Sequence, residues 1–306
     1  MLCAAIDIGS NTTRVLVAEP QNGQLRKVME QRAYTRIGNA SRHNGKIDKE
    51  KVAEVAEVVC TQVNLAEEVG AESIRIVATA AIREARNRDS VLAEIEAAAG
   101  MAVTVLSEEE EGRYAFVGAT KTLGHPVGGD IGVVDVGGGS SEIILGTAAE
   151  GARNVHSFKI GSGSLADDFL ESDPPSASEI RRLRDHIEDF FADVEVDQPA
   201  QAVAVGGSAT SLSKLVGTAL EYETLERAVR VLSGDTIADV ARRFELDPLR
   251  VKLLPAGVLL LEKLSELLGQ PLQIGKGGLR EGVILEQLSD GSSNGSSNGR
   301  PSALAA

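Results

Sequence analysis

One short pattern occurs twice in this chain, and it constrains the fold more than any other feature. Residues 4–11 read Ala-Ala-Ile-Asp-Ile-Gly-Ser-Asn, and residues 133–141 read Val-Val-Asp-Val-Gly-Gly-Gly-Ser-Ser. In both places an apolar run ends in Asp-x-Gly, small polar residues follow, and a second apolar run begins. This pattern predicts a β-hairpin whose tip exposes backbone N–H groups. Two such hairpins, far apart in the sequence, predict two related domains that close on one ligand.

Hairpin tips of this kind are suited to binding phosphate. Glycine leaves the backbone N–H groups uncovered, and neighbouring N–H groups form a concave anion site. A carboxylate at the mouth of each loop can hold a divalent cation against the phosphates, and Asp7 and Asp135 stand at these positions. The candidate phosphate-binding residues are Ser10, Asn11, Gly138, Gly139 and Ser140. Plain hairpin turns are the alternative interpretation.

The charge of the chain excludes one class of partner. Its 306 residues include 31 Lys and Arg and 45 Asp and Glu, which give a formal net charge of -14. No basic surface for nucleic acid is expected, and any phosphate site must be a local cluster of cations and N–H groups. The N-terminus carries no basic segment, and the most apolar long stretch, 251–268, is interrupted by charges. We therefore expect no membrane segment and a cytoplasmic protein.

Strands and helices alternate along both halves of the chain. Asp48 is a candidate N-cap for a helix that reaches about Val69, and residues 73–78 form a short apolar run. The second half repeats a hairpin and a third strand, followed by helices from Leu165 and Ser176. This alternation predicts α/β layers, each built around a five-stranded mixed sheet.

Domain limits follow from the repeated hairpins. We place the first domain at residues 1–124 and the second at 125–278. A closing helix at about 279–289 is expected to pack back on the first domain. Residues 290–306 repeat Gly, Ser and Asn, which cannot bury apolar surface, so this tail is expected to be disordered.

The acidic run 107–111 contains one residue that helix capping does not explain. Ser107 and Glu110 have the spacing of a capping box, and acidic residues suit the positive end of a helix. Glu111 lies one step further round that helix. If the helix start faces the cleft, Glu111 could act as a general base on a water molecule, although a solvent-facing carboxylate remains the alternative.

Several other residues are candidates for the same site. Glu142, just past the second loop, could bind a cation or be an edge-strand carboxylate. Arg83 could clamp a phosphate or pair with Glu84 or Glu109. A strand leads into Gly206, Gly207 and Ser208, where a helix N-terminus could attract phosphate or a tight turn could form. Arg250 could reach the cleft or simply lie solvated on the surface, and Arg280 could reach the cleft or pair with Glu281 or Glu286.

Taken together and in order, these motifs resemble those of the bacterial exopolyphosphatase and guanosine pentaphosphate phosphohydrolase family. The matching segments are Asp7 to Asn11, Ala78 to Arg83, Ser107 to Arg113, Asp135 to Glu142, Gly206 to Thr210 and Gly278 to Gly282. The family belongs to the superfamily of actin, sugar kinases and heat-shock ATPases. The resemblance therefore implies two actin-like (ribonuclease H-like) α/β domains, with mixed sheets flanked by helices and a cleft between them.

The resemblance also implies an activity, namely release of orthophosphate from the terminal phosphoanhydride of inorganic polyphosphate. Glu111 matches the catalytic carboxylate and Arg83 the motif arginine of the family. Gly137 joins the second phosphate loop, and Mg²⁺, with Mn²⁺ as the alternative, is expected at Asp7, Asp135 and Glu142. Longer relatives carry a C-terminal helical domain that is missing here, which favours short chains. A homodimer is expected from the resemblance alone.

Three other functions remain open at this point. The chain could hydrolyse guanosine pentaphosphate specifically, because the same family acts on that nucleotide. It could be an ATP-dependent phosphotransferase, because the strand before Gly206 resembles the adenosine loop of the related kinases. It could also be a sensor that binds nucleotide or polyphosphate without turnover.

Overall fold

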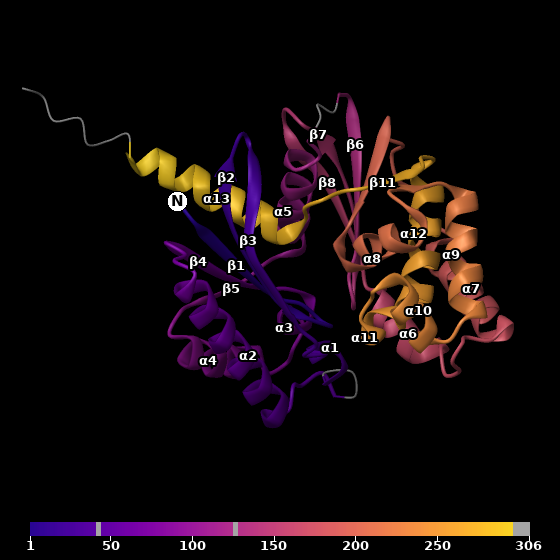
Figure 1. Ribbon diagram of the computed structural model, residues 1–306, viewed down its shortest axis with the longest axis horizontal. Coiled ribbons are helices and arrows are strands. Elements are labelled where there is room, and N and C mark those ends of the chain that lie inside the picture. Colours follow the sequence, from indigo (N-terminus) through magenta and orange to yellow (C-terminus); the bar gives the residue numbers. More distant parts are fainter. Residues whose placement is uncertain (41–43, 125–127, 296–306) are drawn as a thin grey trace, which may run out of the picture.

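A computed structural model describes residues 1–40, 44–124 and 128–295, with side chains up to residue 290. In this part the chain forms two mixed β-sheets, each covered by helices on both faces (Figure 1). The α/β fold with two sheets and a cleft between them confirms the prediction from the sequence. Within the described ranges no helix is long and apolar enough to cross a membrane.

The first sheet carries the first of the paired hairpins at its centre. Its strands, in spatial order, are β3 (Gln24–Ala33), β2 (Thr13–Gln21), β1 (Cys3–Ile8), β4 (Ser73–Ala78) and β5 (Val103–Val105). The hairpin strands β1 and β2 are antiparallel, whereas β4 and β5 run parallel to β1. Because parallel neighbours bring their carboxyl ends to the same edge, the tip of the β1–β2 loop and the end of β4 lie at one edge of the sheet.

Four helices belong to the outer side of this sheet: α1 (Ile37–Ala40), α2 (Lys49–Glu68), α3 (Ala80–Arg83) and α4 (Arg88–Ala99). The side chain of Asp48 accepts a hydrogen bond from the Lys51 backbone N–H, which confirms the predicted N-cap of α2. The apolar stripe of α2, including Val55 and Val59, is buried against the sheet. Burial of this stripe fixes the outer layer of the first half.

The second sheet repeats the arrangement around the second hairpin. Its strands, in spatial order, are β10 (Ala219–Leu220), β11 (Leu272–Ile274), β9 (Gln201–Val205), β6 (Asp130–Val136), β7 (Ser141–Thr147) and β8 (Gly151–Phe158). Strand β9 is parallel to β6, as β4 is to β1. We expected five strands, and the sixth is the two-residue β10, which is too short to leave a periodic signal in the sequence.

The outer side of the second sheet is the larger helical layer. It consists of α6 (Ser162–Phe169), α7 (Ala177–Phe191), α8 (Gly206–Val216), α9 (Tyr222–Gly234), α10 (Ile237–Phe244), α11 (Pro248–Val251) and α12 (Leu254–Leu268). Helix α12 is buried along most of its length and lies at the centre of this layer. Its continuous apolar surface is typical of a helix enclosed by other helices.

Two helices cross each other between the sheets, and each packs on the sheet of the other half of the chain. Helix α5 (Glu108–Lys121) precedes the second hairpin, but Phe116 and its neighbours pack against the second sheet. Helix α13 (Leu279–Gly295) follows the second sheet, but Val283 and Ile284 pack against the first (Figure 1). The helices touch where glycines remove side chains, since a Cβ on Gly282 would lie 2.0 Å from the carbonyl oxygen of Tyr114. The crossing therefore joins the two halves.

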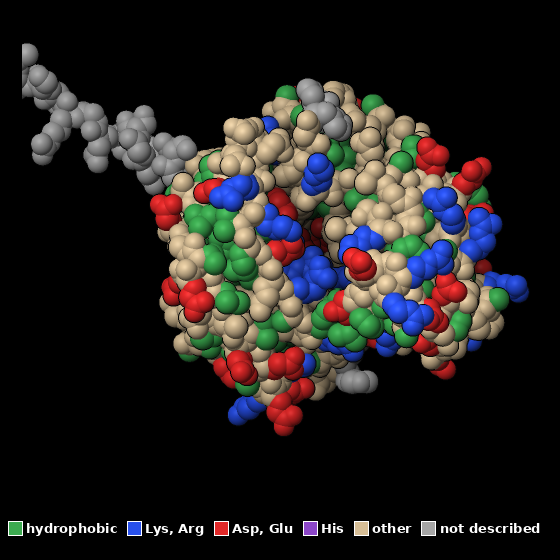
Figure 2. Space-filling model, viewed as in Figure 1, with side chains coloured by type: hydrophobic (Ala, Val, Ile, Leu, Met, Phe, Trp, Pro, Cys, Tyr) green, Lys and Arg blue, Asp and Glu red, His purple; other side chains and the backbone are tan. Residues whose placement is uncertain are grey.

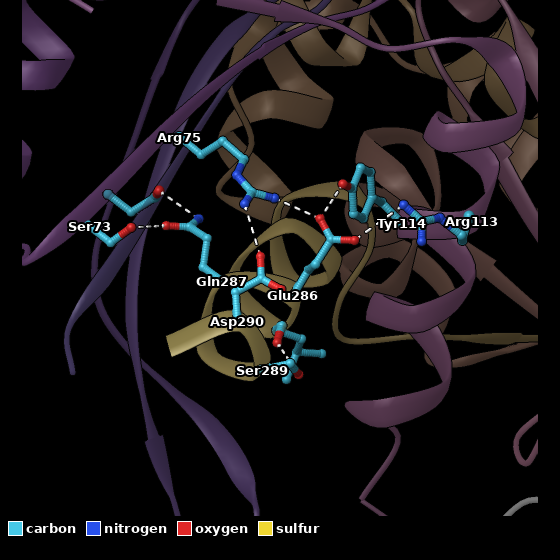
Figure 3. A network of polar contacts seen from close by, with 10 residues as sticks. Ser73, Arg75, Arg113, Tyr114, Glu286, Gln287, Ser289 and Asp290 are labelled. Carbon is cyan, nitrogen blue, oxygen red and sulfur yellow. Dashed lines mark hydrogen bonds and ion pairs between the residues drawn. The ribbon is translucent and has the colours of Figure 1, made fainter. Parts of the chain in front are cut away.

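A network of polar contacts around Glu286 also joins α13 to β4 and α5. The carboxylate of Glu286 on α13 accepts hydrogen bonds from Arg75 of β4, at 2.6 Å, and from Tyr114 of α5, and it pairs with Arg113 at 3.2 Å (Figure 3). Gln287 bonds to the hydroxyl of Ser73. One helix thus bonds to both the first sheet and α5.

Helix α13 also corrects the predicted tail. The helix begins at Leu279, as expected, but it continues to Gly295, so residues 290–295 are helical rather than disordered. Residues 296–306 of the predicted tail lie outside the described residues. The Ser-rich sequence gives no apolar periodicity here, and the helix is an extension of the turns that pack on β1.

Candidate active site

The two glycine loops have the same backbone geometry. In the first, the Gly9 N–H donates to the carbonyl oxygen of Thr12 at 3.0 Å, and in the second, the Gly137 N–H donates to that of Ser140 at 3.0 Å. Each loop follows the central strand of its sheet. The repeated sequence thus produces a repeated turn, as the hairpin pattern predicted.

The two loops meet face to face. A Cβ on Gly138 would lie 2.7 Å from the Cβ of Asn11, and one on Gly139 would lie 2.8 Å from the Oγ of Ser10. Only glycine permits this approach, because a methyl group at either position would have to displace the opposite loop. The backbones of both loops therefore face one common space.

That space is a polar cavity of about 150 Å³ between the two halves. In Figure 2, Lys and Arg side chains gather around the hollow between the halves, and Asp and Glu side chains lie within it. Nearly all predicted site residues line the cavity: Asp7, Ser10, Asn11, Glu111, Asp135, Gly137, Gly138, Gly139, Ser140, Glu142, Gly206, Gly207, Arg250 and Arg280. Arg83 and Ser208 are the exceptions.

Both exceptions have a structural reason. The Arg83 guanidinium donates to Glu111 Oε2 at 2.8 Å and to the carbonyl oxygen of Leu106 at 3.0 Å, so it holds the acid instead of contacting the cavity. The Ser208 side chain is fully buried on the inner face of α8, with its hydroxyl 3.4 Å from that of Ser162. The predicted phosphate roles of Arg83 and of the helix start at Ser208 therefore stay predictions.

Carboxylates at the base of the cavity lie close enough to repel one another. Loss of solvent, and then the charge of Asp7, raise the pKa of Asp135 to about 6. Loss of solvent also raises the pKa of Asp7 and, together with the charges of Glu111 and Asp135, that of Glu142. Burying several like charges is unfavourable unless a cation compensates them.

The cavity carboxylates are suited to a divalent cation that also binds phosphate oxygens of the ligand. Within the described ranges no three His, Cys, Asp or Glu side chains are arranged to hold a metal by themselves. Asp7 Oδ1, however, is buried without a hydrogen-bond partner, whereas Glu142 accepts a hydrogen bond from Ser157 at 3.1 Å. Mg²⁺ commonly uses one or two carboxylates plus substrate phosphates. Asp7 and Asp135 suit that mode, and the metal role of Glu142 stays a prediction.

Glu111 lies in the first turn of α5, where the helix cap fixes its backbone and Arg83 bonds its carboxylate. The predicted capping box is present: Ser107 accepts from the Glu110 N–H at 3.1 Å, and Glu110 accepts from the Ser107 N–H at 2.8 Å. Loss of solvent and the charges of Asp7 and Asp135 raise the pKa of Glu111 to about 7, against the opposing effect of Arg83. A carboxylate with this pKa can accept a proton near neutral pH.

Three arginine side chains also line the cavity, those of Arg14, Arg250 and Arg280. Arg14, which the sequence analysis missed, lies across the strand pair from Asp7, and Gly207 makes room for both Arg14 and Arg250. Loss of solvent and the neighbouring arginines, Arg280, Arg32 and Arg250, lower the pKa of Arg14 to about 9. Arg280 pairs with Glu30 at 2.9 Å and Asp7 faces Arg14, yet the convergence of several arginines on one cavity indicates a polyanionic ligand.

Three residues that line the cavity carry a buried nitrogen atom without a hydrogen-bond partner in the described part of the chain. Asn11 Nδ2, Arg250 Nε and Arg280 Nη1 are buried and make no hydrogen bond in the described part of the chain. Buried polar groups normally have partners, and these three lie on residues that line one cavity. A ligand with several acceptor oxygens would satisfy them.

The fold and the paired loops define a two-domain protein of the actin-like class, and comparison with known proteins narrows the class to one family. The Ppx/GppA phosphatase family matches residues 16–290, so the chain belongs to this family and is a phosphatase.

Individual relatives span nearly the whole chain. It is 28% identical to "Exopolyphosphatase 1" of Mycobacterium leprae over 94% of its own length and 90% of that protein's. The crystal structure of the Aquifex aeolicus family member has a TM-score of 0.79 at 28% identity, covering 95% of this chain and 98% of that one. The "Guanosine-5'-triphosphate,3'-diphosphate pyrophosphatase" of Vibrio vulnificus is 27% identical over 94% of this chain and 60% of that protein.

Proposed function

We propose that the chain hydrolyses the terminal phosphoanhydride of inorganic polyphosphate and releases orthophosphate. One observation carries the proposal: Glu111 lines the same small cavity as both glycine loops, and its pKa is raised to about 7. An acid at the anion site, able to take up a proton, is what hydrolysis requires and what a binding protein has no need of.

Each residue then has a role in the reaction. Glu111 orients the attacking water and accepts its proton, while Arg83 holds the Glu111 carboxylate in place. The loop N–H groups, with Asn11, position the terminal phosphate for in-line attack. Positioning and charge stabilisation supply most of the acceleration in phosphoryl transfer, so the fixed loops and arginines carry the largest share.

A divalent cation belongs to this proposal. Asp7 and Asp135 would hold Mg²⁺ or Mn²⁺, with Glu142 as a further candidate. When bound, the cation neutralises charge on the phosphate oxygens. It would also offset the loss of solvent and the charge of Asp7, which raise the pKa of Asp135.

The remaining phosphates of the substrate have a separate place to bind. A groove of about 450 Å³ adjoins the cavity and shares Arg14, Gly207, Thr210, Lys276, Arg280 and Glu281 with it. It also contains Lys27, Arg32 and Glu30, which pairs with Lys27 and Arg280, and we call it the arginine groove. Its size favours a short stretch of polyphosphate, consistent with the expected preference for short chains.

Guanosine pentaphosphate is the second candidate substrate. The Vibrio vulnificus relative is named for hydrolysis of this nucleotide and matches 94% of this chain. The arginine groove would accept the phosphates of either molecule, because arginine forks bind phosphate whatever is attached to it.

An orthophosphate-release assay separates these functions. Purified protein is incubated with polyphosphates of several lengths, with guanosine pentaphosphate and with ATP plus an acceptor, each with and without Mg²⁺. We expect the highest kcat/KM on short polyphosphate and activity only when Mg²⁺ is present. Transfer of phosphate to the acceptor would favour a phosphotransferase, and binding without any release would indicate a sensor.

The raised carboxylate pKa values predict how metal-free stability depends on pH. Asp135 and Glu111 titrate at about 6 and about 7 in the folded protein, above their ordinary values of 3.8 and 4.5. The folded state therefore binds protons more tightly than the unfolded state, and its stability falls as pH rises through this window. We expect the Tm of the metal-free protein to fall between about pH 5 and about pH 8.

Mg²⁺ should reverse that loss, because it binds the deprotonated carboxylates. Differential scanning fluorimetry should show a larger Mg²⁺-induced rise in Tm at about pH 8 than at about pH 5. The Asp135→Asn variant is the control and should show a flatter pH profile with a smaller response to Mg²⁺. Equal Mg²⁺ responses at the two pH values in the unaltered protein would contradict the prediction.

A further inference from the structure

A second cavity opens on another side of the glycine loops. It has a volume of about 290 Å³ and shares Ser10, Asn11, Gly138 and Gly139 with the catalytic cavity. Thr79 lines the catalytic cavity, and the next two residues, Ala80 and Ala81, line the second one. The two cavities therefore adjoin each other at the glycine loops.

Among the residues that the structure describes, the second cavity and the arginine groove have no lining residue in common. The groove meets the catalytic cavity at Arg14 and Arg280, whereas the second cavity meets it at Ser10 and Gly138. In an in-line hydrolysis the water attacks from the side away from the leaving group. The new orthophosphate then lies on the side away from the shortened chain, which still fills the groove.

Two polar contacts between residues that line the second cavity join the halves of the molecule. Asn39 of α1 donates to Asp167 Oδ2 of α6 at 2.8 Å, and Asp167 also lies 3.6 Å from the ammonium group of Lys252. Lys159, just after β8, pairs with Glu84, just after α3, at 3.1 Å. Both contacts lie among exposed side chains and can open without unfolding either half.

Helices α1 and α6, which carry Asn39 and Asp167, are bonded to the two glycine loops. On the first half, the Gly38 N–H donates to the carbonyl oxygen of Ser10 at 2.8 Å. On the second half, the N–H groups of Gly163 and Ser164 donate to the carbonyl oxygen of Gly138 at 2.9 and 3.0 Å. A shift of either loop after phosphate cleavage would therefore move α1 or α6, and with it the contact between Asn39 and Asp167.

We propose that this second cavity is the exit route for orthophosphate, and that the Asn39–Asp167 and Lys159–Glu84 contacts are its gate. The proposal rests on the hydrolase function proposed above. Arg36, Lys159 and Lys252 line the route and supply cations that attract a small anion. Glu84 and Asp167 pair with the two lysines and keep the gate closed until phosphate competes for them. The shortened chain can then stay in the arginine groove while its product leaves.

Two stopped-reaction measurements test the route. With short polyphosphate and Mg²⁺, rapid quenching reports cleavage in the first turnovers, and a fluorescent phosphate-binding protein reports free orthophosphate. Arg36→Trp and Ser164→Trp each narrow the second cavity without removing a gate contact and without touching Glu111 or the arginine groove. In both variants we expect cleavage at the unaltered rate in the first turnover, but free orthophosphate about tenfold slower. Lys27→Trp, in the arginine groove, is the control and should raise KM without such a delay.

The results that would overturn the exit route differ from the result that would overturn the hydrolase function. Coincident cleavage and release in the two Trp variants would overturn the exit route. So would a folded Trp variant that no longer cleaves, because a plug beyond the loops should leave the catalytic cavity intact. Failure of the unaltered protein to cleave any phosphate would instead overturn the hydrolase function itself.

Discussion

Glu111→Gln should reduce kcat on polyphosphate by about 10²–10⁴-fold, the usual contribution of a general base. The substitution keeps the size of the side chain and a hydrogen-bonding oxygen for Arg83, but the amide cannot accept a proton from water. Because the arginines of the groove, and not Glu111, are proposed to hold the polyphosphate chain, ligand binding should be almost unchanged. Orthophosphate release measures the loss of turnover, and calorimetric titration with polyphosphate measures the retained affinity.

Glu110→Gln is the matched control for this variant. It makes the same chemical change one residue earlier, on the same helix turn, and glutamine also serves in a capping box. Its activity and stability should therefore stay near those of the unaltered protein. If the two variants lost activity equally, the effect would come from the helix start, and Glu111 would not be the base.

Gly282→Ala should destabilise the protein by about 3 kcal/mol or more, at the upper end of the range for overpacking. The added methyl group would lie 2.0 Å from the carbonyl oxygen of Tyr114, a backbone atom in the middle of α5. Helix α13 cannot move aside freely, because Glu286 holds it to Arg75 and Tyr114 one turn further on (Figure 3). Urea unfolding followed by circular dichroism measures the change.

Gly234→Ala is its control, because Gly234 ends α9 and no atom lies within 4 Å of the position of its Cβ. This change should be neutral or stabilise the protein by up to about 1 kcal/mol, through a less flexible unfolded chain. Since each half supplies one glycine loop, Gly282→Ala should also lower activity. A neutral Gly282→Ala would show that the α5–α13 contact is looser than described.

Local sequence signals predicted a large part of this fold. The two Asp-x-Gly hairpins, the Asp48 N-cap and the Ser107 capping box all depend on residues within a few positions of one another. Interactions of that range are encoded in short stretches of sequence, so they were predicted at the correct residues. The glycines of the second loop indicated an anion site, but not that this loop would lie against Asn11 of the first.

Interactions between distant segments could not be predicted in the same way. Nothing near Arg83 shows that it bonds Glu111, because the contact depends on how β4 and α5 pack. Helix α5 precedes the second hairpin yet packs on the second sheet, which follows only from its crossing with α13. Arg14 did leave a signal: a charged residue in an apolar strand, directly across the hairpin from Asp7. Cross-strand neighbours share a face, so this pair could have been included in the site.

The most direct test is a crystal structure of the Glu111→Gln variant with short polyphosphate and Mg²⁺. We expect the terminal phosphate between residues 9–12 and 137–140, with the chain extending along Arg14 and Arg280 and a water molecule held by the residue at position 111. An anion bound elsewhere, or a side chain at position 111 turned to bulk solvent, would contradict the proposed mechanism.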